Sequence, residues 1–167
     1  MDKRYFLIIL IIILCSFSLY NIAVNSDVVG TATVECGKYI CSIPNGFSLY
    51  NSEKNEVACS DGNGMYIYIY TALSNNANYT NKIYEIEKSN ETDLISNGTI
   101  NNNGMIIHSI YYVEKKDGTN RSTFYFTKDD NNFRLIITGF NYDTERNKTV
   151  KIASDIADSI KFNYKRA

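Results

Sequence analysis

The stretch Met105-Ile106-Ile107-His108-Ser109-Ile110-Tyr111-Tyr112-Val113-Glu114 decides the fold. Successive side chains of a strand point to opposite faces of its sheet. One face of this predicted strand carries Met105, Ile107, Tyr111 and Val113, and the other carries Ile106, Ile110 and Tyr112. A sheet that is apolar on both faces must be covered on both. The sequence therefore predicts a middle layer of strands between two covering layers.

Further strands surround this stretch on both sides. Residues that tolerate turn dihedrals separate successive strands, at Asn103-Gly104, Asp117-Gly118 and Asp129 to Asn132. The chain therefore turns back tightly each time. The resulting meander has four predicted strands, at 94–100, 105–114, 121–128 and 133–140. Three shorter strands precede it, at 39–43, 56–60 and 65–71.

Two amphipathic segments provide the covering layers. The first, residues 79–89, has Ile83 and Ile86 three positions apart, and the second begins near Asp143 or Thr144 and runs to about Phe162. Such spacing places apolar side chains on one side of a helix. The longer helix has an apolar stripe made of Val150, Ala153, Ile156, Ala157 and Ile160. The predicted order is β-β-β-α-β-β-β-β-α, an α+β fold with a mostly antiparallel sheet of about six to seven strands between two helices.

A hydrophobic helix is expected before this domain. The basic residues Lys3 and Arg4 run into an apolar stretch from Tyr5 to Cys15 that extends, with polar interruptions, to Val24. Twenty residues of helix cross a bilayer once, and basic flanks stay in the cytoplasm. We expect a signal-anchor or a cleaved signal peptide at 1–25, a linker at 26–37 and an extracytoplasmic domain at 38–164. The predicted location is the cell membrane, single-pass with the C-terminal domain outside, or, after cleavage, secretion.

Composition excludes several classes of function. The 167 residues include 17 Lys and Arg against 18 Asp and Glu, without the basic concentration that nucleic-acid binding needs. A hydrophobic content of 44% excludes a wholly disordered chain. The glycine-rich and metal-binding motifs of nucleotide and zinc enzymes do not occur. We expect no cofactor and no nucleic-acid partner.

Three cysteines fall in the predicted exported domain, Cys36, Cys41 and Cys59. An oxidising compartment permits one disulfide, for which we weigh Cys41–Cys59 and, as an alternative, Cys36–Cys59. Buried, reduced thiols that act as small hydrophobic residues are the other possibility. No metal site is expected, because the cysteines lack a second close pair. The loop at Asp61-Gly62-Asn63-Gly64 resembles the start of a calcium loop, but Ala72 stands where the closing glutamate belongs.

His108 is the single histidine and the first candidate for acid–base catalysis. It lies mid-strand on the face of Ile106, Ile110 and Tyr112, and no motif places a nucleophile or an orienting carboxylate beside it. A structural role is the simpler interpretation. The alternative is an exported hydrolase with a site near His108.

Tyrosines alternate along residues 66–70. Tyr66, Tyr68 and Tyr70 share one face of the strand, while Met65, Ile67 and Ile69 share the other. Exposed tyrosines in a row suit a sugar or a protein partner. Covered by a helix, the same rings would belong to the core. These three residues are the candidate binding site.

Five N-x-S/T triplets are candidates for glycosylation in an exported domain. Their asparagines are Asn78, Asn90, Asn97, Asn120 and Asn147.

Short motifs give the chain a resemblance to a known family. The stretch Ile43-Pro44-Asn45-Gly46-Phe47 follows a strand, Asn103-Gly104 precedes a long strand, and the last helix ends at Ile156-Ala157-Asp158-Ser159-Ile160-Lys161-Phe162. Over residues 38–163 this pattern resembles the small exported α+β domains of the PsbP-like family, and is similar to membrane-tethered archaeal proteins of unknown function. The resemblance implies a binding or assembly-accessory role and transfers no functional residue.

These observations favour a membrane-tethered extracytoplasmic binding or assembly-accessory module without catalytic activity. Its expected partners are the membrane, through the N-terminal helix, and an envelope protein or glycan. The alternatives are the hydrolase with a site near His108 and a structural, glycosylated cell-surface protein.

Overall fold

The computed structural model describes residues 29–71 and 79–164. The predicted N-terminal helix at 1–25 and the candidate Asn78 lie outside these ranges. Among the described helices, none is long and apolar enough to span a bilayer.

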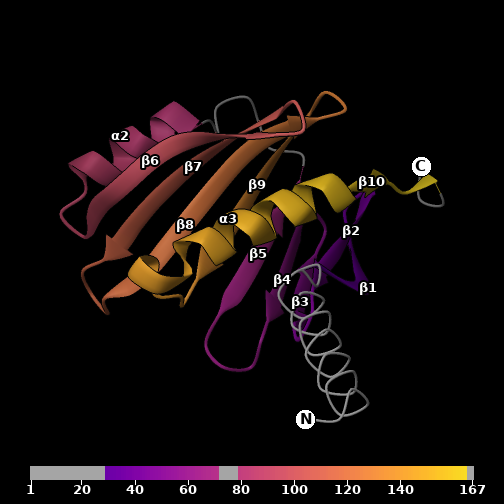
Figure 1. The fold of residues 1–167 in the computed structure, drawn as a ribbon, viewed down its shortest axis with the longest axis horizontal. Helices are drawn as coiled ribbons and strands as arrows, with labels where there is room; N and C mark the ends of the chain where they lie inside the picture. Colours follow the sequence, from indigo (N-terminus) through magenta and orange to yellow (C-terminus); the bar gives the residue numbers. More distant parts are fainter. Residues whose placement is uncertain (1–28, 72–78, 165–167) are drawn as a thin grey trace, which may run out of the picture.

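Two helices and ten strands make up the described parts of the chain (Figure 1). The helices are α2 (Tyr79–Lys88) and α3 (Tyr142–Ser159). The strands are β1 (Val29–Cys36), β2 (Tyr39–Pro44), β3 (Ser48–Glu53), β4 (Glu56–Ser60), β5 (Tyr66–Tyr70), β6 (Thr92–Asn102), β7 (Met105–Glu114), β8 (Thr119–Lys128), β9 (Asn131–Thr138) and β10 (Lys161–Phe162).

Seven strands form one antiparallel sheet in the order β3-β4-β5-β9-β8-β7-β6. The predicted α+β class, with two helices and a mostly antiparallel sheet of six to seven strands, is confirmed. β1, β2 and β10 form a separate small sheet in the order β1-β2-β10. The predicted strand at 39–43 therefore exists as β2 but does not belong to the large sheet.

Besides the two-residue β10, which lies in the predicted end of the last helix, two strands occur where the sequence predicted none. β1 occupies most of the expected linker at 26–37, where Val34 and Cys36 are buried against the core. β3 lies at the edge of the large sheet with all six residues exposed. An edge strand without a buried face has no alternation of apolar and polar residues, so periodicity does not reveal it.

α3 covers one face of the large sheet, which is turned toward the viewer in Figure 1. Its buried residues pack in one core with inward side chains of β5, β7, β8 and β9, among them Ile67, Tyr111, Phe124 and Leu135. Beside α3, the small sheet adds Cys41 and Ile43 to the same core. The buried positions of α3 are Thr149, Ile152, Ala153, Ile156 and Ala157, whereas Val150 of the predicted stripe is only partly buried.

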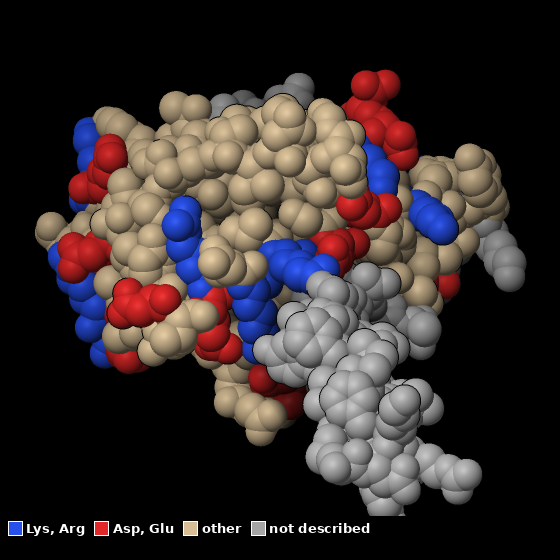
Figure 2. All heavy atoms as spheres, in the orientation of Figure 1, with Lys and Arg blue, Asp and Glu red and all other residues tan. Residues whose placement is uncertain are grey.

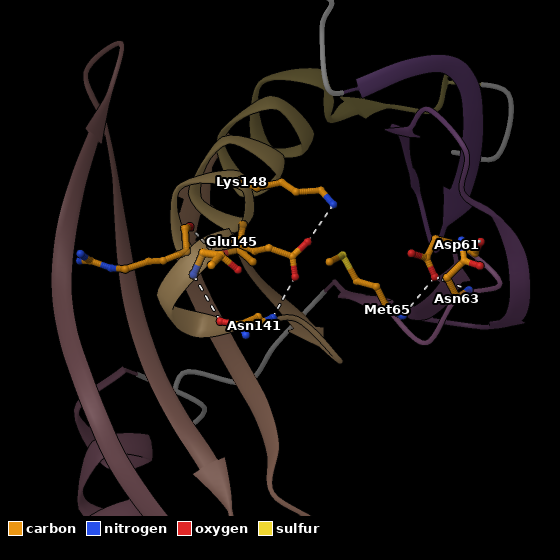
Figure 3. A network of polar contacts seen from close by, with 9 residues as sticks. Asp61, Asn63, Met65, Asn141, Glu145 and Lys148 are labelled. Atoms are coloured by element: carbon orange, nitrogen blue, oxygen red, sulfur yellow. Dashed lines mark hydrogen bonds and ion pairs between the residues drawn. The ribbon is translucent and has the colours of Figure 1, made fainter. Parts of the chain in front are cut away.

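The ends of α3 differ from the prediction. Asn141, and not Asp143 or Thr144, is the N-cap, and its Oδ1 accepts hydrogen bonds from the backbone N–H groups of both those residues. A carboxylate oxygen of Glu145 accepts a hydrogen bond from the backbone N–H of Asn141 at 2.8 Å (Figure 3). At the other end the helix stops at Ser159, because residues 161–162 pair with β2. Lys128 Nζ donates to the carbonyls of Ala157 and Asp158 there, each at 2.8 Å.

α2 covers part of the opposite face. Ile86, with Tyr79 and Ile83, packs on side chains that β6, β7 and β8 direct away from α3, namely Leu94, Ile110, Tyr112 and Tyr125. The two-sided cover expected from β7 is therefore present. The packing of α2 is confined to the β6–β8 side of the sheet.

A tight backbone contact joins the turn before β5 to the residue that follows β9. Gly139 has a φ of +76°, and a Cβ there would lie 2.0 Å from the carbonyl oxygen of Gly64. Gly64 belongs to the turn in which Asp61 Oδ1 accepts the N–H groups of Asn63 at 2.8 Å and Met65 at 3.0 Å (Figure 3). The Asp61 carboxylate thus stabilises the turn that contains it. No side chain fits at Gly139, because the backbone of Gly64 lies too close.

Cys36, Cys41 and Cys59 are free thiols in this structure, and all three are buried. They correspond to the reduced alternative and not to the predicted Cys41–Cys59 or Cys36–Cys59 disulfide. Burial raises the pKa of Cys36 and Cys59 to about 11 and that of Cys41 to about 12. The thiolate is the reactive form of cysteine, so these thiols are inert at neutral pH.

We expect Ile156→Asp to lower the free energy of unfolding by several kcal/mol or to prevent folding, because Ile156 is fully buried and a carboxylate there has no partner. The control Asn147→Asp, at an exposed position of the same helix, should change stability by no more than about 0.5 kcal/mol. Urea unfolding measures both, and equal stability of the two variants would contradict the packing of α3.

A matched pair of glycine variants tests the contact at Gly139. Gly62 has a similar φ of +74°, but a Cβ there would have no atom within 4 Å. Gly62→Ala should cost about 1 kcal/mol for the left-handed conformation alone. Gly139→Ala should cost clearly more, since the backbone of Gly64 must also move. Thermal unfolding that shifts equally in both variants would show that the contact is absent.

The thiols can be tested by alkylation. In the folded protein at pH 8, iodoacetamide should leave residues 36, 41 and 59 unmodified, because burial excludes the reagent and keeps the thiols protonated. After unfolding without a reductant, all three should react. Peptide mapping by mass spectrometry reads each site separately. A cross-linked pair of peptides that includes Cys59 would instead support the disulfide predicted from the sequence.

Candidate binding surface

β5 directs its residues alternately to the two faces of the large sheet. Ile67 and Ile69 are fully buried in the core beneath α3. Tyr66, Tyr68 and Tyr70 point to the opposite face and are half-buried. They are neither part of the core cluster under α2 nor freely exposed. The exposure of these rings is therefore intermediate between the two alternatives that the sequence left open, an exposed row and a row covered by a helix.

The tyrosine rings form a row along the strand. The rings of Tyr66 and Tyr68 are stacked, with centroids 6.4 Å apart and planes 24° from parallel. Tyr50 from β3 places its ring edge-on to Tyr66 at 5.7 Å and is 68% exposed. Sequence reasoning did not include Tyr50, because β3 itself was not predicted.

Arg134 on β9 extends the row at its other end. It lies opposite Tyr70 in the register between β5 and β9, and its guanidinium carbon is 4.3 Å from the centroid of the Tyr70 ring. A guanidinium at this distance is attracted by the ring. We call Tyr50, Tyr66, Tyr68, Tyr70 and Arg134 the tyrosine face. Arg134 was also missed from the sequence, because the pairing of β5 with β9 joins residues more than sixty positions apart.

Small and polar side chains lie beside the tyrosines. In register with Tyr68, Ala58 on β4 is buried on one side and Ile136 on β9 is half-buried on the other. One strand further, Thr123 is fully buried and its hydroxyl has no hydrogen-bond partner within the described ranges. Nε of Arg134 is likewise a buried atom with no hydrogen-bond partner within the described ranges. Both atoms are buried, so they lie beneath the surface and are not open to a partner.

Burial and a nearby carboxylate act on Tyr70. The pKa of Tyr70 is raised to about 12, first by burial and next by the Glu56 carboxylate. Its phenol therefore stays protonated at neutral pH, and the Glu56 carboxylate is its hydrogen-bond acceptor. On the opposite side of the molecule, basic and acidic side chains are interspersed over the surface that Figure 2 shows.

His108, the candidate catalytic residue, is half-buried beside α2. Its ring stacks on Tyr79 with centroids 4.6 Å apart, and Nδ1 lies 3.3 Å from the hydroxyl of Thr99. Among the described residues no carboxylate forms an ion pair with His108. A histidine and a hydroxyl are thus brought together, but the group that would orient the imidazole is not found in the described chain.

Four of the candidate glycosylation sites fall on described residues. Asn90 and Asn97 are exposed, and Asn97 Oδ1 accepts from the Tyr79 hydroxyl at 3.2 Å. The Asn120 amide donates to the carbonyl of Phe140 at 3.1 Å. Asn147 is exposed on α3, but Thr149 of the same triplet is fully buried. Asn90, Asn97 and Asn147 are thus the exposed asparagines of these four.

Potential metal ligands do not gather in the described ranges. Within 29–71 and 79–164, no three His, Cys, Asp or Glu residues are grouped so that they could hold a metal ion.

No family model matches the chain, and no curated protein matches it. Solved structures do show similarity of fold. CyanoP, the cyanobacterial PsbP of Synechocystis sp. PCC 6803, is 15% identical with a TM-score of 0.48, and the match covers 75% of this chain and 86% of that one. PA94 of Pseudomonas aeruginosa, a putative regulator of unknown function, is 10% identical with a TM-score of 0.40, over 71% of this chain and 89% of that one.

A Bacteroides thetaiotaomicron VPI-5482 protein is also 10% identical, with a TM-score of 0.42 over 75% of this chain and 45% of that one. The resemblance to PsbP-like domains expected from the sequence thus reappears, as a weak one, in the comparison of structures.

Proposed function

We propose that this protein is a non-catalytic binding or assembly-accessory module that the N-terminal segment holds at the outer side of a membrane. The tyrosine face is its binding surface, and an envelope protein or a glycan is its partner. The observation that carries this proposal is the half-buried tyrosine row on a part of the sheet that neither described helix covers.

The composition of the tyrosine face supports binding. Tyrosine and arginine are the residues that most often dominate protein interfaces, because each combines a large apolar area with hydrogen-bonding groups. Here four tyrosines and one arginine come from three different strands, β3, β5 and β9. Strands paired in one sheet hold these side chains at fixed spacing, so little ordering is needed when a partner binds.

Tethering to a membrane rests on the sequence. Lys3 and Arg4 followed by a long apolar stretch are typical of a segment whose N-terminus stays in the cytoplasm. The small domain would then lie outside. Protease added to intact cells should degrade the domain, and alkaline washing should leave it with the membranes if the segment is uncleaved. Protection from protease in intact cells would contradict the proposed location.

A second candidate function is hydrolysis near His108, which the 3.3 Å approach of Thr99 to the imidazole favours. A hydroxyl nucleophile needs a base that is itself oriented by a third group. His108→Gln distinguishes the candidates, because it removes a base but lies outside the tyrosine face. Loss of a hydrolytic activity in this variant would favour the enzyme.

Site-specific cross-linking tests the binding proposal on the full-length protein in its native membrane. A photo-reactive amino acid at position 50 or 66 should form adducts with one partner, because both positions lie on the tyrosine face. The control is position 84, where Tyr84 on α2 is 57% exposed but lies outside this surface. Adducts of equal yield from positions 66 and 84, or none from position 66, would refute the assignment of the surface.

Loss of binding should follow when the rings are removed. Tyr66→Thr combined with Tyr68→Thr keeps strand-forming side chains while deleting the stacked pair, and we expect at least about a tenfold weaker capture of the partner, as for loss of central interface residues. Tyr84→Ala should capture normally. Melting curves for both variants separate a binding defect from unfolding.

A further inference from the structure

Arg134 differs from Arg121, the other arginine on its face of the sheet, in having no ion pair within the described ranges. Arg121 forms an ion pair with Glu114 at 2.8 Å. Among the described residues no carboxylate lies within ion-pair distance of Arg134. Arg134 is half-buried, so part of its hydration is already lost. A partly desolvated cation gains more from an anionic partner than one surrounded by water.

The side chains around Arg134 hold it in place. On one side the ring of Tyr70 lies beneath the guanidinium, and on the other side Tyr125 is its partner in the register of β8 and β9. The Arg134 charge also interacts with the Tyr125 hydroxyl. Nε of Arg134 and the buried hydroxyl of Thr123 nevertheless have no acceptor in the described chain. Both atoms are buried, so an acceptor brought by a partner would meet the exposed part of the half-buried Arg134 side chain and not these atoms.

The orientation of the rings indicates which class of partner suits this surface. Sugars bind best on the flat faces of exposed aromatic rings. In this row the Arg134 guanidinium already lies over the ring of Tyr70, and the rings of Tyr50 and Tyr66 meet at 76°. Part of the ring surface is thus occupied by side chains of the row itself. The remaining apolar area and the hydroxyl groups match the mixed apolar and polar side chains of a protein better than the face of a sugar ring.

We propose that the tyrosine face binds a protein segment that presents a carboxylate to Arg134. The carboxylate would accept two parallel hydrogen bonds from the guanidinium, and apolar side chains on either side of it would pack against the tyrosine rings. This inference rests on the proposed function and makes it more specific, because it selects a protein over a glycan and an acidic residue as the point of recognition.

Titration followed by NMR tests this proposal with the full-length protein in detergent micelles. The probes are an acetylated and amidated Leu-Leu-Glu-Leu-Leu peptide, the same peptide with glutamine in place of glutamate, and a short oligogalacturonate as an acidic glycan. The side-chain Nε–Hε signal of Arg134 and the ring signals of Tyr66 and Tyr68 report on binding. We expect the glutamate peptide to shift these signals and to bind about tenfold more tightly than the glutamine peptide, as for one charge-assisted hydrogen-bonded pair.

Two variants and a control identify the residue responsible. Arg134→Gln should abolish the preference for the glutamate peptide, and Arg134→Lys, which keeps the charge but not the planar fork, should retain only part of it. Arg146→Gln is the matched control, because Arg146 lies near Tyr111 and Tyr142 on the α3 side. It should bind both peptides as the wild type does. Melting temperatures show whether each variant is folded.

Three results would overturn the inference: equal affinity for the glutamate and glutamine peptides, no shift at Arg134 with either peptide, or tighter binding of oligogalacturonate at the same residues. These results are separate from failure of the proposed function. If cross-linking at positions 50 and 66 succeeds while Arg134→Gln captures the partner normally, the tyrosine face is the binding surface but a carboxylate is not what it recognises.

Discussion

The two apolar faces of β7 constrain the rest of the structure, because each face has to be kept from water by a separate layer. The two covers are unequal. α3, with 18 residues, and the small sheet together close one side. α2 has 10 residues, and a helix about 10 Å wide covers about two strands that lie about 4.8 Å apart. α2 rests on the β6–β8 side, so the tyrosine face results directly from the difference between the covers.

The residues of β5 match this partial cover. Isoleucine faces the closed side, where Ile67 and Ile69 are fully buried, and tyrosine faces the other. A tyrosine ring can shield the sheet beneath it while its hydroxyl still reaches water. Covering the same surface by a second molecule would bury these hydroxyls, and they could then donate to or accept from the partner. A row of phenylalanines would shield the sheet equally well but could not exchange water for a polar contact.

Local sequence patterns predicted the elements whose residues alternate or repeat. The four strands of the meander, β5 and both helices were found in this way, because burial on one or two faces leaves a period of 2 or 3.6 residues. β1 and β3 were missed for the opposite reason. The exposed β3 has no buried side, and β1 is composed largely of small residues. The cap of α3 was misplaced because Asn141, Asp143 and Thr144 are all good capping residues, and only the structure shows which of them accepts the backbone N–H groups.

Part of the tyrosine face could not have been found from the sequence. Tyr66, Tyr68 and Tyr70 are two residues apart on one strand, so their shared face follows from the pleat alone. Arg134 and Tyr50 reach them through pairing in the sheet, and β9 lies beside β5 although three strands and a helix separate the two in the chain. The neighbours of the rings have the same non-local origin. Buried Ala58 and Thr138 lie beside Tyr68 and Tyr66 in register, on strands β4 and β9. The neighbouring strands therefore determine which side chains adjoin the row, and with them the chemistry of the partner that it can bind.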